Sequence, residues 1–261
     1  MAIDPALSAL ARAAGESGIF CDFDGCLAPI VSDPDDARPV DGAEAVLDQL
    51  ASRFRIVAIV SGRSVADLAG RISARGVRLV GLHGMEQLRD GEVHVHAKAE
   101  AARAAIERAG ASMEPILRDV PGAQLERKGL ALAVHFRRAA DPDAAEAIAG
   151  PLVRDAAAAE GLDVVPGRRI LEVRPKAGGD KGDAVLRMIE EESLRGALVA
   201  GDDVGDLPAF DAIAGLEIAV RVAVSSPESP EELSTRADVV VGSPEAFLTL
   251  LERLARDAAT A

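Results

Sequence analysis

The sequence contains no tryptophan and no tyrosine, and aromatic residues make up only 2% of its 261 positions. Proteins that bind single-stranded nucleic acids stack the bases on aromatic side chains, and this sequence has few such side chains to offer. Basic residues are also in deficit, because 29 Lys and Arg stand against 43 Asp and Glu and leave a formal net charge of −14. Nucleic-acid phosphates are held mainly by Lys and Arg, so we expect no nucleic-acid partner. A small phosphorylated substrate stays compatible with this charge, since it needs only a local cationic pocket.

Cysteine and long apolar runs are scarce as well. The two cysteines, Cys21 and Cys26, flank an acidic pair; no disulfide is expected there, and so low a count is typical of a reducing cytosol. No apolar run approaches about 18 residues, and the N-terminal stretch lacks the basic and then apolar segments of a signal peptide. We therefore expect a cytoplasmic protein without a membrane segment, and no obligate protein partner is evident.

Hydrophobic residues make up 49% of the chain, enough for a sizeable core built from Ala, Val, Leu and Ile. In the first and last thirds, short apolar runs alternate with amphipathic stretches. Examples are the expected strand GIFCDFD at 18–24, the expected helix at 41–53 and the expected strand RIVAIVSG at 55–62. The same alternation returns at 179–193 and 196–203. Continuous apolar strands separated by helices predict an α/β fold with a parallel sheet covered on both faces.

The middle of the chain has a different pattern. EVHVH at 92–96 and LALAVHFR at 130–137 alternate polar and apolar residues, which is typical of half-exposed antiparallel strands. Ala-rich helical stretches lie around them. We therefore predict a discontinuous core formed by residues 1–86 and 172–261, with an inserted α+β cap domain at 87–171.

Charged motifs follow several of the expected strands. Residues 19–30 read IFCDFDGCLAPI, an apolar run that ends in two aspartates, Asp22 and Asp24. Crowding two carboxylates is unfavourable unless a cation or a shared proton relieves them. VSGR at 60–63 and GDDVGD at 201–206 also follow apolar runs, and DKGDA lies at 180–184. Because parallel sheets bind ligands beyond the carboxyl ends of their strands, we expect these motifs to converge.

Such a set of residues is suited to phosphoryl transfer. A carboxylate such as Asp22 can attack phosphorus and form an aspartyl-phosphate, which divides one difficult hydrolysis into two easier steps. Mg²⁺ takes oxygen ligands and offsets the negative charge, and Asp22 and Asp202 are the candidate ligands. The ammonium of Lys181 can stabilise the phosphoryl oxygens in the transition state.

The remaining residues of these motifs have complementary roles. Ser61 and the backbone amide of Gly62 can donate hydrogen bonds to the phosphoryl oxygens. Asp24 can protonate the leaving alkoxide and then deprotonate the attacking water. Ser64 is the expected N-cap of the next helix. We expect Arg63 to solvate the start of that helix, and binding of a sugar hydroxyl is the other interpretation.

The four motifs together resemble the signature of the haloacid dehalogenase superfamily, in its order, from residue 22 to residue 206. The resemblance implies a Rossmann-like core, Mg²⁺, Asp22 as the nucleophile and Asp24 as the acid–base. It also implies that Asp202 binds the metal. Asp203 and Asp206 would be supporting carboxylates, which either contact the metal ligands or reach the metal through water. Metal candidates by this resemblance are Asp22, Asp24, Asp202, Asp203 and Asp206.

A finer resemblance, over about residues 17–247, is to the trehalose-6-phosphate phosphatases. DFDGCLAPI, VSGRSVADL, GLHGME and LEVRP are similar to segments of that family, and LERKGLALAVHFR at 125–137 resembles its cap signature. The resemblance implies hydrolysis of trehalose 6-phosphate, with the sugar held by Glu126, Lys128, His135 and Arg137. This chain departs from the family pattern at Cys26, where Thr is usual, and at Leu207-Pro208.

Other interpretations stay open on the sequence alone. The four cap residues are also consistent with an ordinary charged strand surface. A related phosphatase could act on another sugar phosphate, such as sucrose, glucosylglycerol or mannosylglycerate phosphate, and a mutase would return the phosphoryl group to the sugar. A phospho-accepting receiver domain also uses Asp, Lys and Mg²⁺ at strand ends. The inserted middle region and the second aspartate argue against a receiver.

Overall fold

The computed structural model describes residues 5–31, 33–89, 91–167, 169–176, 179–226 and 229–260. The chain divides into two compact units, one formed by Met1–Val93 with Asp180–Ala261 and the other by His94–Gly179. Each boundary lies later in the chain than the predicted limits of 86/87 and 171/172.

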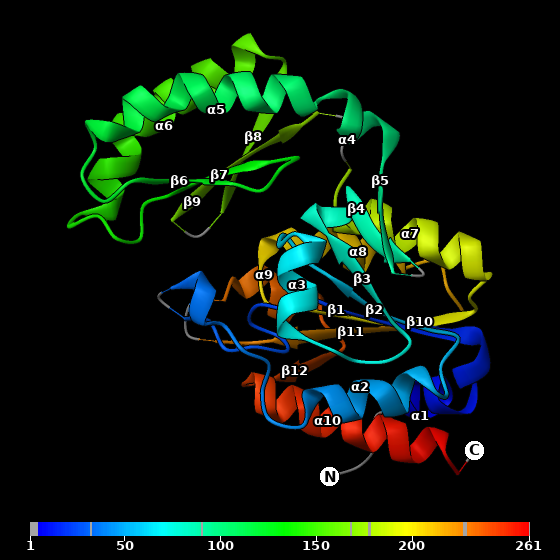
Figure 1. The fold of residues 1–261 in the computed structure, drawn as a ribbon. Coiled ribbons are helices and arrows are strands. Elements are labelled where there is room, and N and C mark those ends of the chain that lie inside the picture. Colours follow the sequence, from blue (N-terminus) through cyan, green and yellow to red (C-terminus); the bar gives the residue numbers. More distant parts are fainter. Residues whose placement is uncertain are drawn as a thin grey trace. The chain divides into compact units, whose positions relative to one another are not determined.

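The first unit is built on an eight-stranded sheet with the order β12-β11-β10-β1-β2-β3-β4-β5 (Figure 1). Its strands are β1 (Ser17–Cys21), β2 (Ile56–Val60), β3 (Val77–Gly81), β4 (Glu86–Arg89), β5 (Glu92–Val95), β10 (Gly196–Gly201), β11 (Ile218–Val224) and β12 (Val239–Val241). From β12 to β3 every neighbouring pair is parallel, and β4 runs antiparallel to β3. β1, β2 and β10 are buried along their whole length, as continuous apolar runs predict for central strands.

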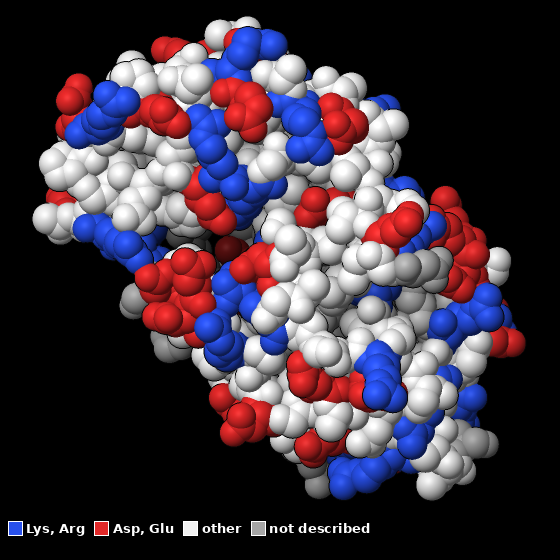
Figure 2. Space-filling model, in the orientation of Figure 1, with Lys and Arg blue, Asp and Glu red and all other residues white. Residues whose placement is uncertain are grey.

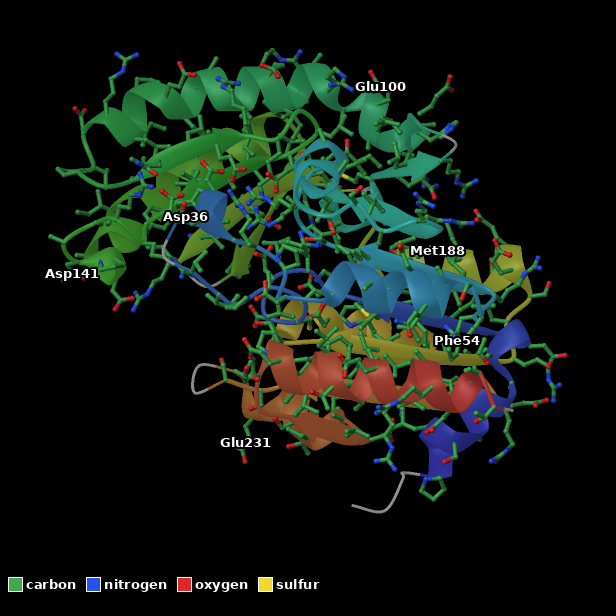
Figure 3. All side chains as sticks on the ribbon, turned by 60° about the horizontal axis from the view of Figure 1, so that its bottom comes forward. Asp36, Phe54, Glu100, Asp141, Met188 and Glu231 are labelled. Atoms are coloured by element: carbon green, nitrogen blue, oxygen red, sulfur yellow. The ribbon has the colours of Figure 1, made fainter. Side chains whose placement is uncertain are left out.

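Helices cover both faces of this sheet and form a hydrophobic core on each (Figure 1). One face carries α1 (Pro5–Arg12), α2 (Ala43–Ala51), α3 (Val65–Arg71) and α10 (Pro244–Ala258); the other carries α7 (Lys181–Glu192), α8 (Leu207–Ala212) and α9 (Glu231–Arg236). On the second face, Met188 of α7, labelled in Figure 3, packs in the same core as Phe20 of β1. Short 3-10 turns are η1 (Ala14–Glu16), η2 (Pro34–Asp36), η3 (Leu82–Gly84) and η4 (Val204–Asp206). The predicted α/β architecture with a parallel sheet covered on both faces is confirmed.

The second unit is an antiparallel four-stranded sheet with helices on one face (Figure 1). The strand order is β6-β7-β9-β8, formed by β6 (Gln124–Arg127), β7 (Leu132–His135), β8 (Leu162–Gly167) and β9 (Ile170–Pro175). Its helices are α4 (Ala97–Ala101), α5 (Arg103–Arg118) and α6 (Pro142–Ala159). Apolar side chains of α5, α6 and the sheet form a separate core that includes Met113, Phe136 and Val153.

Two strands do not follow the predicted boundaries. Residues 92–95 were expected in the inserted region, but they form β5, which extends the edge of the eight-stranded sheet and is divided by the boundary after Val93. Residues from 172 onward were expected in the core, but residues 172–175 belong to β9, which pairs with β7 and β8. Buried positions alternate along β9, and Leu171 and Val173 join the core of the second unit. The sheet to which β9 belongs is thus set by the core that receives its apolar side chains.

The surface reflects the acidic composition without separating the charges. On the face drawn in Figure 2, basic side chains are interspersed with acidic ones instead of forming one continuous basic surface. Within the described ranges, no helix combines the length and the apolar character that a membrane span requires.

Candidate active site

Asp22 lies directly beyond β1, at the centre of the eight-stranded sheet. Its backbone N–H donates to the carbonyl of Ala200 in β10 at 3.0 Å, which continues the parallel ladder by one residue. Its carboxylate oxygen Oδ1 accepts a hydrogen bond from the N–H of Phe23 at 2.7 Å. The side chain is buried and stands at the carboxyl edge of the sheet, as the sequence predicted.

Asp202 follows β10, the strand beside β1, and is buried against the DFDGC turn. Gly25 in that turn has a φ of +78°, a conformation that residues with a side chain rarely adopt, and a Cβ there would overlap the carboxylate of Asp202. The glycine therefore allows the first and fourth motifs to come into direct contact.

Lys181 brings the third motif to the same place. It is the first residue of α7, which begins with a capping box in which the side chains of Asp180 and Asp183 bond each other's backbone N–H. The Nζ atom lies 2.7 Å from Oδ2 of Asp22 and 2.7 Å from Oδ1 of Asp206. Lys181 is only 5% exposed, so its positive charge is stabilised by these two carboxylates and not by solvation in water.

Asp206 ties the lysine to the loop that carries Asp202. While Oδ1 accepts from Lys181, Oδ2 accepts from the backbone N–H groups of Asp202 and Asp203 at 3.0 and 3.1 Å. Both oxygens are thus engaged in shaping the site. Asp203 caps η4, where its Oδ1 accepts from the N–H of Val204 at 2.7 Å.

The site fits a divalent cation. Carboxylate oxygens of Asp22, Asp202 and Asp206 lie within 4.8 Å of one another, and all three residues are buried. Oxygen-only donors of this kind suit a hard cation such as Mg²⁺. Of the five residues predicted for the metal, the structure brings these three together within one cluster, whereas Asp24 and Asp203 have carboxylates directed to Arg63 and to η4.

The electrostatics of the cluster show how strongly the carboxylates are crowded. Burial raises the pKa of Asp22 from 3.8 to about 7. The positive charge of Lys181 lowers this pKa, and the negative charges of Asp206 and Asp24 raise it further. Burial alone would lower the pKa of Lys181, but the neighbouring Asp206 and Asp22 outweigh it and raise this pKa. Without a further cation, Asp22 therefore holds a proton more readily than an exposed aspartate does.

The remaining predicted phosphate ligands follow β2, the other neighbour of β1. Ser61 is buried. Its backbone N–H donates to the carbonyl of Val80 at 3.0 Å, and its carbonyl accepts from the N–H of His83 at 2.9 Å. Gly62 is the next residue in this loop. Because β1 and β2 pair in parallel, with Cys21 opposite Ile59, the loop lies at the same edge of the sheet as Asp22.

Arg63 differs from the sequence expectation. Its Nε and one terminal nitrogen donate to the two carboxylate oxygens of Asp24 at 2.7 and 2.8 Å, instead of only solvating the start of α3. Sequence reasoning missed this pairing, although the occurrence of a charged residue in each of two converging motifs was an available signal. The prediction of Ser64 as the N-cap of α3 is confirmed, because its hydroxyl accepts from the N–H of Asp67.

The second unit gathers three of the four predicted sugar ligands around one face of its sheet. Glu126 accepts from Nε2 of His135 at 2.8 Å, and its Oε2 lies 3.9 Å from Nζ of Lys128. Lys128 also pairs with Glu172 at 3.3 Å, a residue left outside the predicted set. Arg137 lies just beyond β7, two residues after His135.

Comparison with known proteins is consistent with this geometry. The family model described as trehalose-phosphatase matches residues 20–241, which is most of the chain. The chain belongs to the trehalose-phosphatase family. The trehalose-phosphate phosphatase of Mycobacterium marinum is 39% identical over 227 residues, covering 83% of this chain and 57% of that protein. The chain thus spans less than two thirds of the length of this relative.

Solved structures show the same fold. The C-terminal domain of trehalose-6-phosphate phosphatase from C. albicans superposes with a TM-score of 0.80 at 27% identity, covering 97% of this chain and 96% of that one. A haloacid dehalogenase-like hydrolase from Bacteroides thetaiotaomicron superposes with a TM-score of 0.62 at 14% identity, over 91% of this chain and 99% of that chain. The predicted haloacid dehalogenase fold is confirmed.

Proposed function

We propose that this member of the trehalose-phosphatase family hydrolyses trehalose 6-phosphate to trehalose and phosphate, through an aspartyl-phosphate on Asp22. The observation that carries the proposal is the buried set of Asp22, Lys181 and Asp202 at the carboxyl edge of the sheet, with Lys181 only 2.7 Å from the nucleophile. Family membership supports the sugar phosphate as the substrate.

In the first step, an oxygen of Asp22 attacks the phosphorus atom and the phosphorus–oxygen bond to the sugar breaks. Asp24, protonated at an oxygen lone pair that Arg63 does not occupy, gives its proton to the departing sugar oxygen. The ammonium of Lys181 has three N–H donors, two of which meet Asp22 and Asp206, so the third is available to a phosphoryl oxygen. Ser61 and the N–H of Gly62 are the proposed further donors to those oxygens.

In the second step, Asp24 takes a proton from water, the water oxygen attacks the phosphorus of the aspartyl-phosphate, and Asp22 is released with inorganic phosphate. Asp22 and Asp202 are the residues that would hold Mg²⁺, with Asp206 orienting them. When bound, Mg²⁺ supplies positive charge to the phosphoryl group and to the ionised Asp22.

The polar cluster of the second unit is the proposed sugar-binding set. Glu126 is hydrogen-bonded to His135 and lies 3.9 Å from Nζ of Lys128, which also pairs with Glu172. Carboxylate, ammonium and imidazole groups supply both donors and acceptors, which a disaccharide with many hydroxyl groups requires. Arg137 completes the proposed set.

The proposal is tested by measuring phosphate release from trehalose 6-phosphate with Mg²⁺, beside sucrose 6-phosphate, glucosylglycerol phosphate and mannosylglycerate phosphate. We expect the highest kcat/KM for trehalose 6-phosphate, and loss of release with the Asp22→Asn variant. A higher kcat/KM for another sugar phosphate would overturn the substrate assignment and leave the phosphoryl chemistry intact. No phosphate release from any of the four would refute the proposed function itself.

A further inference from the structure

Arg63 makes a two-point contact with Asp24, the residue assigned to proton transfer under the proposed function. Nε of Arg63 donates to Oδ2 of Asp24 at 2.7 Å and NH2 donates to Oδ1 at 2.8 Å. A carboxylate bound through both oxygens cannot turn about its Cβ–Cγ bond without breaking both hydrogen bonds. The backbone of Asp24 is fixed as well, by an isolated bridge to Ala28.

Arg63 is itself held from several directions. Its NH1 donates to Oδ2 of Asp67 at 2.7 Å, its NH2 also donates to the carbonyl of Pro34 at 2.9 Å, and the guanidinium lies 5.5 Å from the centre of the Phe23 ring. The Arg63 side chain is 12% exposed, so solvent has little part in orienting it.

A second arginine extends the same network. Arg71 binds both oxygens of Asp67, at 2.8 Å through Nε and 2.7 Å through NH2, and donates to the carbonyls of Asp35 and Ala37. The turn η2, which Asp36 marks in Figure 3, is thereby tied to helix α3. Asp67 thus has one arginine on each side and fixes the position of Arg63.

We propose that Arg63 is a positioning residue that holds the carboxylate of Asp24 in the orientation for proton exchange with the sugar oxygen and with water, and that Asp67 keeps Arg63 in place. This inference rests on the proposed function of Asp24. Lysine cannot replace the arginine in this role, because a single ammonium does not match both carboxylate oxygens. The contrasting role is direct contact of Arg63 with the substrate.

The two roles are separated by the chemistry of the leaving group. A sugar alkoxide must be protonated as it departs, whereas nitrophenolate is a weak base and leaves p-nitrophenyl phosphate without a proton. If Arg63 acts through Asp24, Arg63→Ala and Arg63→Lys should lower kcat for trehalose 6-phosphate on the order of 100-fold, within the range of acid–base catalysis. Hydrolysis of p-nitrophenyl phosphate should fall by less than about tenfold, since only the water-activating step is affected.

A double-mutant cycle provides the second measurement. In an Asp24→Asn background, Arg63→Ala should change kcat for trehalose 6-phosphate by less than about threefold, because the group through which it acts is already gone. An equal loss in the wild-type and Asp24→Asn backgrounds, or an equal loss for both substrates, would overturn the proposal and favour direct substrate contact.

Controls separate positioning from unfolding and from failure of the proposed function. Asp67→Asn removes the support of Arg63 without touching Asp24, and should show the same preference for p-nitrophenyl phosphate to a smaller degree. Arg55→Ala breaks only the exposed pair with Glu192 and should leave both rates unchanged. Circular dichroism and Tm monitor folding of every variant. A wild-type protein that hydrolyses p-nitrophenyl phosphate and no sugar phosphate would refute the proposed function, whereas an active wild type with unselective losses would refute only the role of Arg63.

Discussion

Replacing Lys181 with methionine tests how far one buried ammonium holds the site together. The substitution keeps the length and apolar stem of the side chain but removes its charge, 2.7 Å from each of two carboxylates. The carboxylate oxygens lie within 4.8 Å of one another, and two unit charges at that limit repel by about 3.5 kcal/mol at an effective dielectric constant of about 20, more if they are closer. Breaking a buried ion pair from one side typically costs about 3–5 kcal/mol, which agrees with that figure.

We therefore expect Lys181→Met to lower the free energy of unfolding by about 3 kcal/mol or more in the presence of a chelator at pH 8, measured by urea denaturation. The loss should shrink at pH 5, because the carboxylates can then be neutralised by protons, and Mg²⁺ should restore part of it. Lys176→Met is the matched control, since Lys176 is exposed, and should change stability by less than about 0.5 kcal/mol. Equal effects of the two substitutions would refute the view that Lys181 balances the acidic cluster.

Two further predictions concern the same site. Burial raises the pKa of Asp22 from 3.8 to about 7. Between about pH 4 and 7 the metal-free folded protein therefore holds a proton that the unfolded protein has lost, so the free energy of unfolding should fall as the pH rises through this window. Mg²⁺ affinity, by calorimetry, should rise over the same window and level off above it; an affinity unchanged from pH 5.5 to 8 would contradict this. Gly25→Ala should abolish phosphatase activity and lower Tm more than Gly91→Ala does, because Gly91 also has a positive φ but has no atom near a Cβ placed there. Equal losses of Tm in the two variants would contradict the close contact of Gly25 with Asp202.

The central part of the fold was predictable because its strands are buried on both faces. The apolar runs ending at Cys21, Val60 and Gly201 identified three adjacent strands, and the charged motifs after them gave the position of the site. The motif lysine was also identified correctly as opening a helix, since capping aspartates surround it at positions 180 and 183.

The edges and the side-chain pairings were not accessible in the same way. Alternation in EVHVH indicates a strand with one buried face but does not say which sheet receives it, so the segment was placed wholly in the inserted region although it pairs in the eight-stranded sheet. The predicted boundary at 171/172 likewise divided the residues of β9, which belong to the second unit. The pairs Arg63–Asp24 and Lys128–Glu172 join residues 39 and 44 positions apart. Such pairs depend on strand order and register, which local patterns do not contain.

The most direct test of the account asks whether Asp22 carries the phosphoryl group. The Asp24→Asn variant, mixed with p-nitrophenyl phosphate and Mg²⁺ and quenched in acid within one turnover, should contain one added phosphoryl mass on the peptide that includes Asp22, because nitrophenolate leaves without a proton while the base that frees the intermediate is absent. Wild-type protein should show less of it, and Asp22→Asn none. Phosphate release from the wild type with no modified peptide in either protein, or full turnover by Asp22→Asn, would contradict the covalent mechanism.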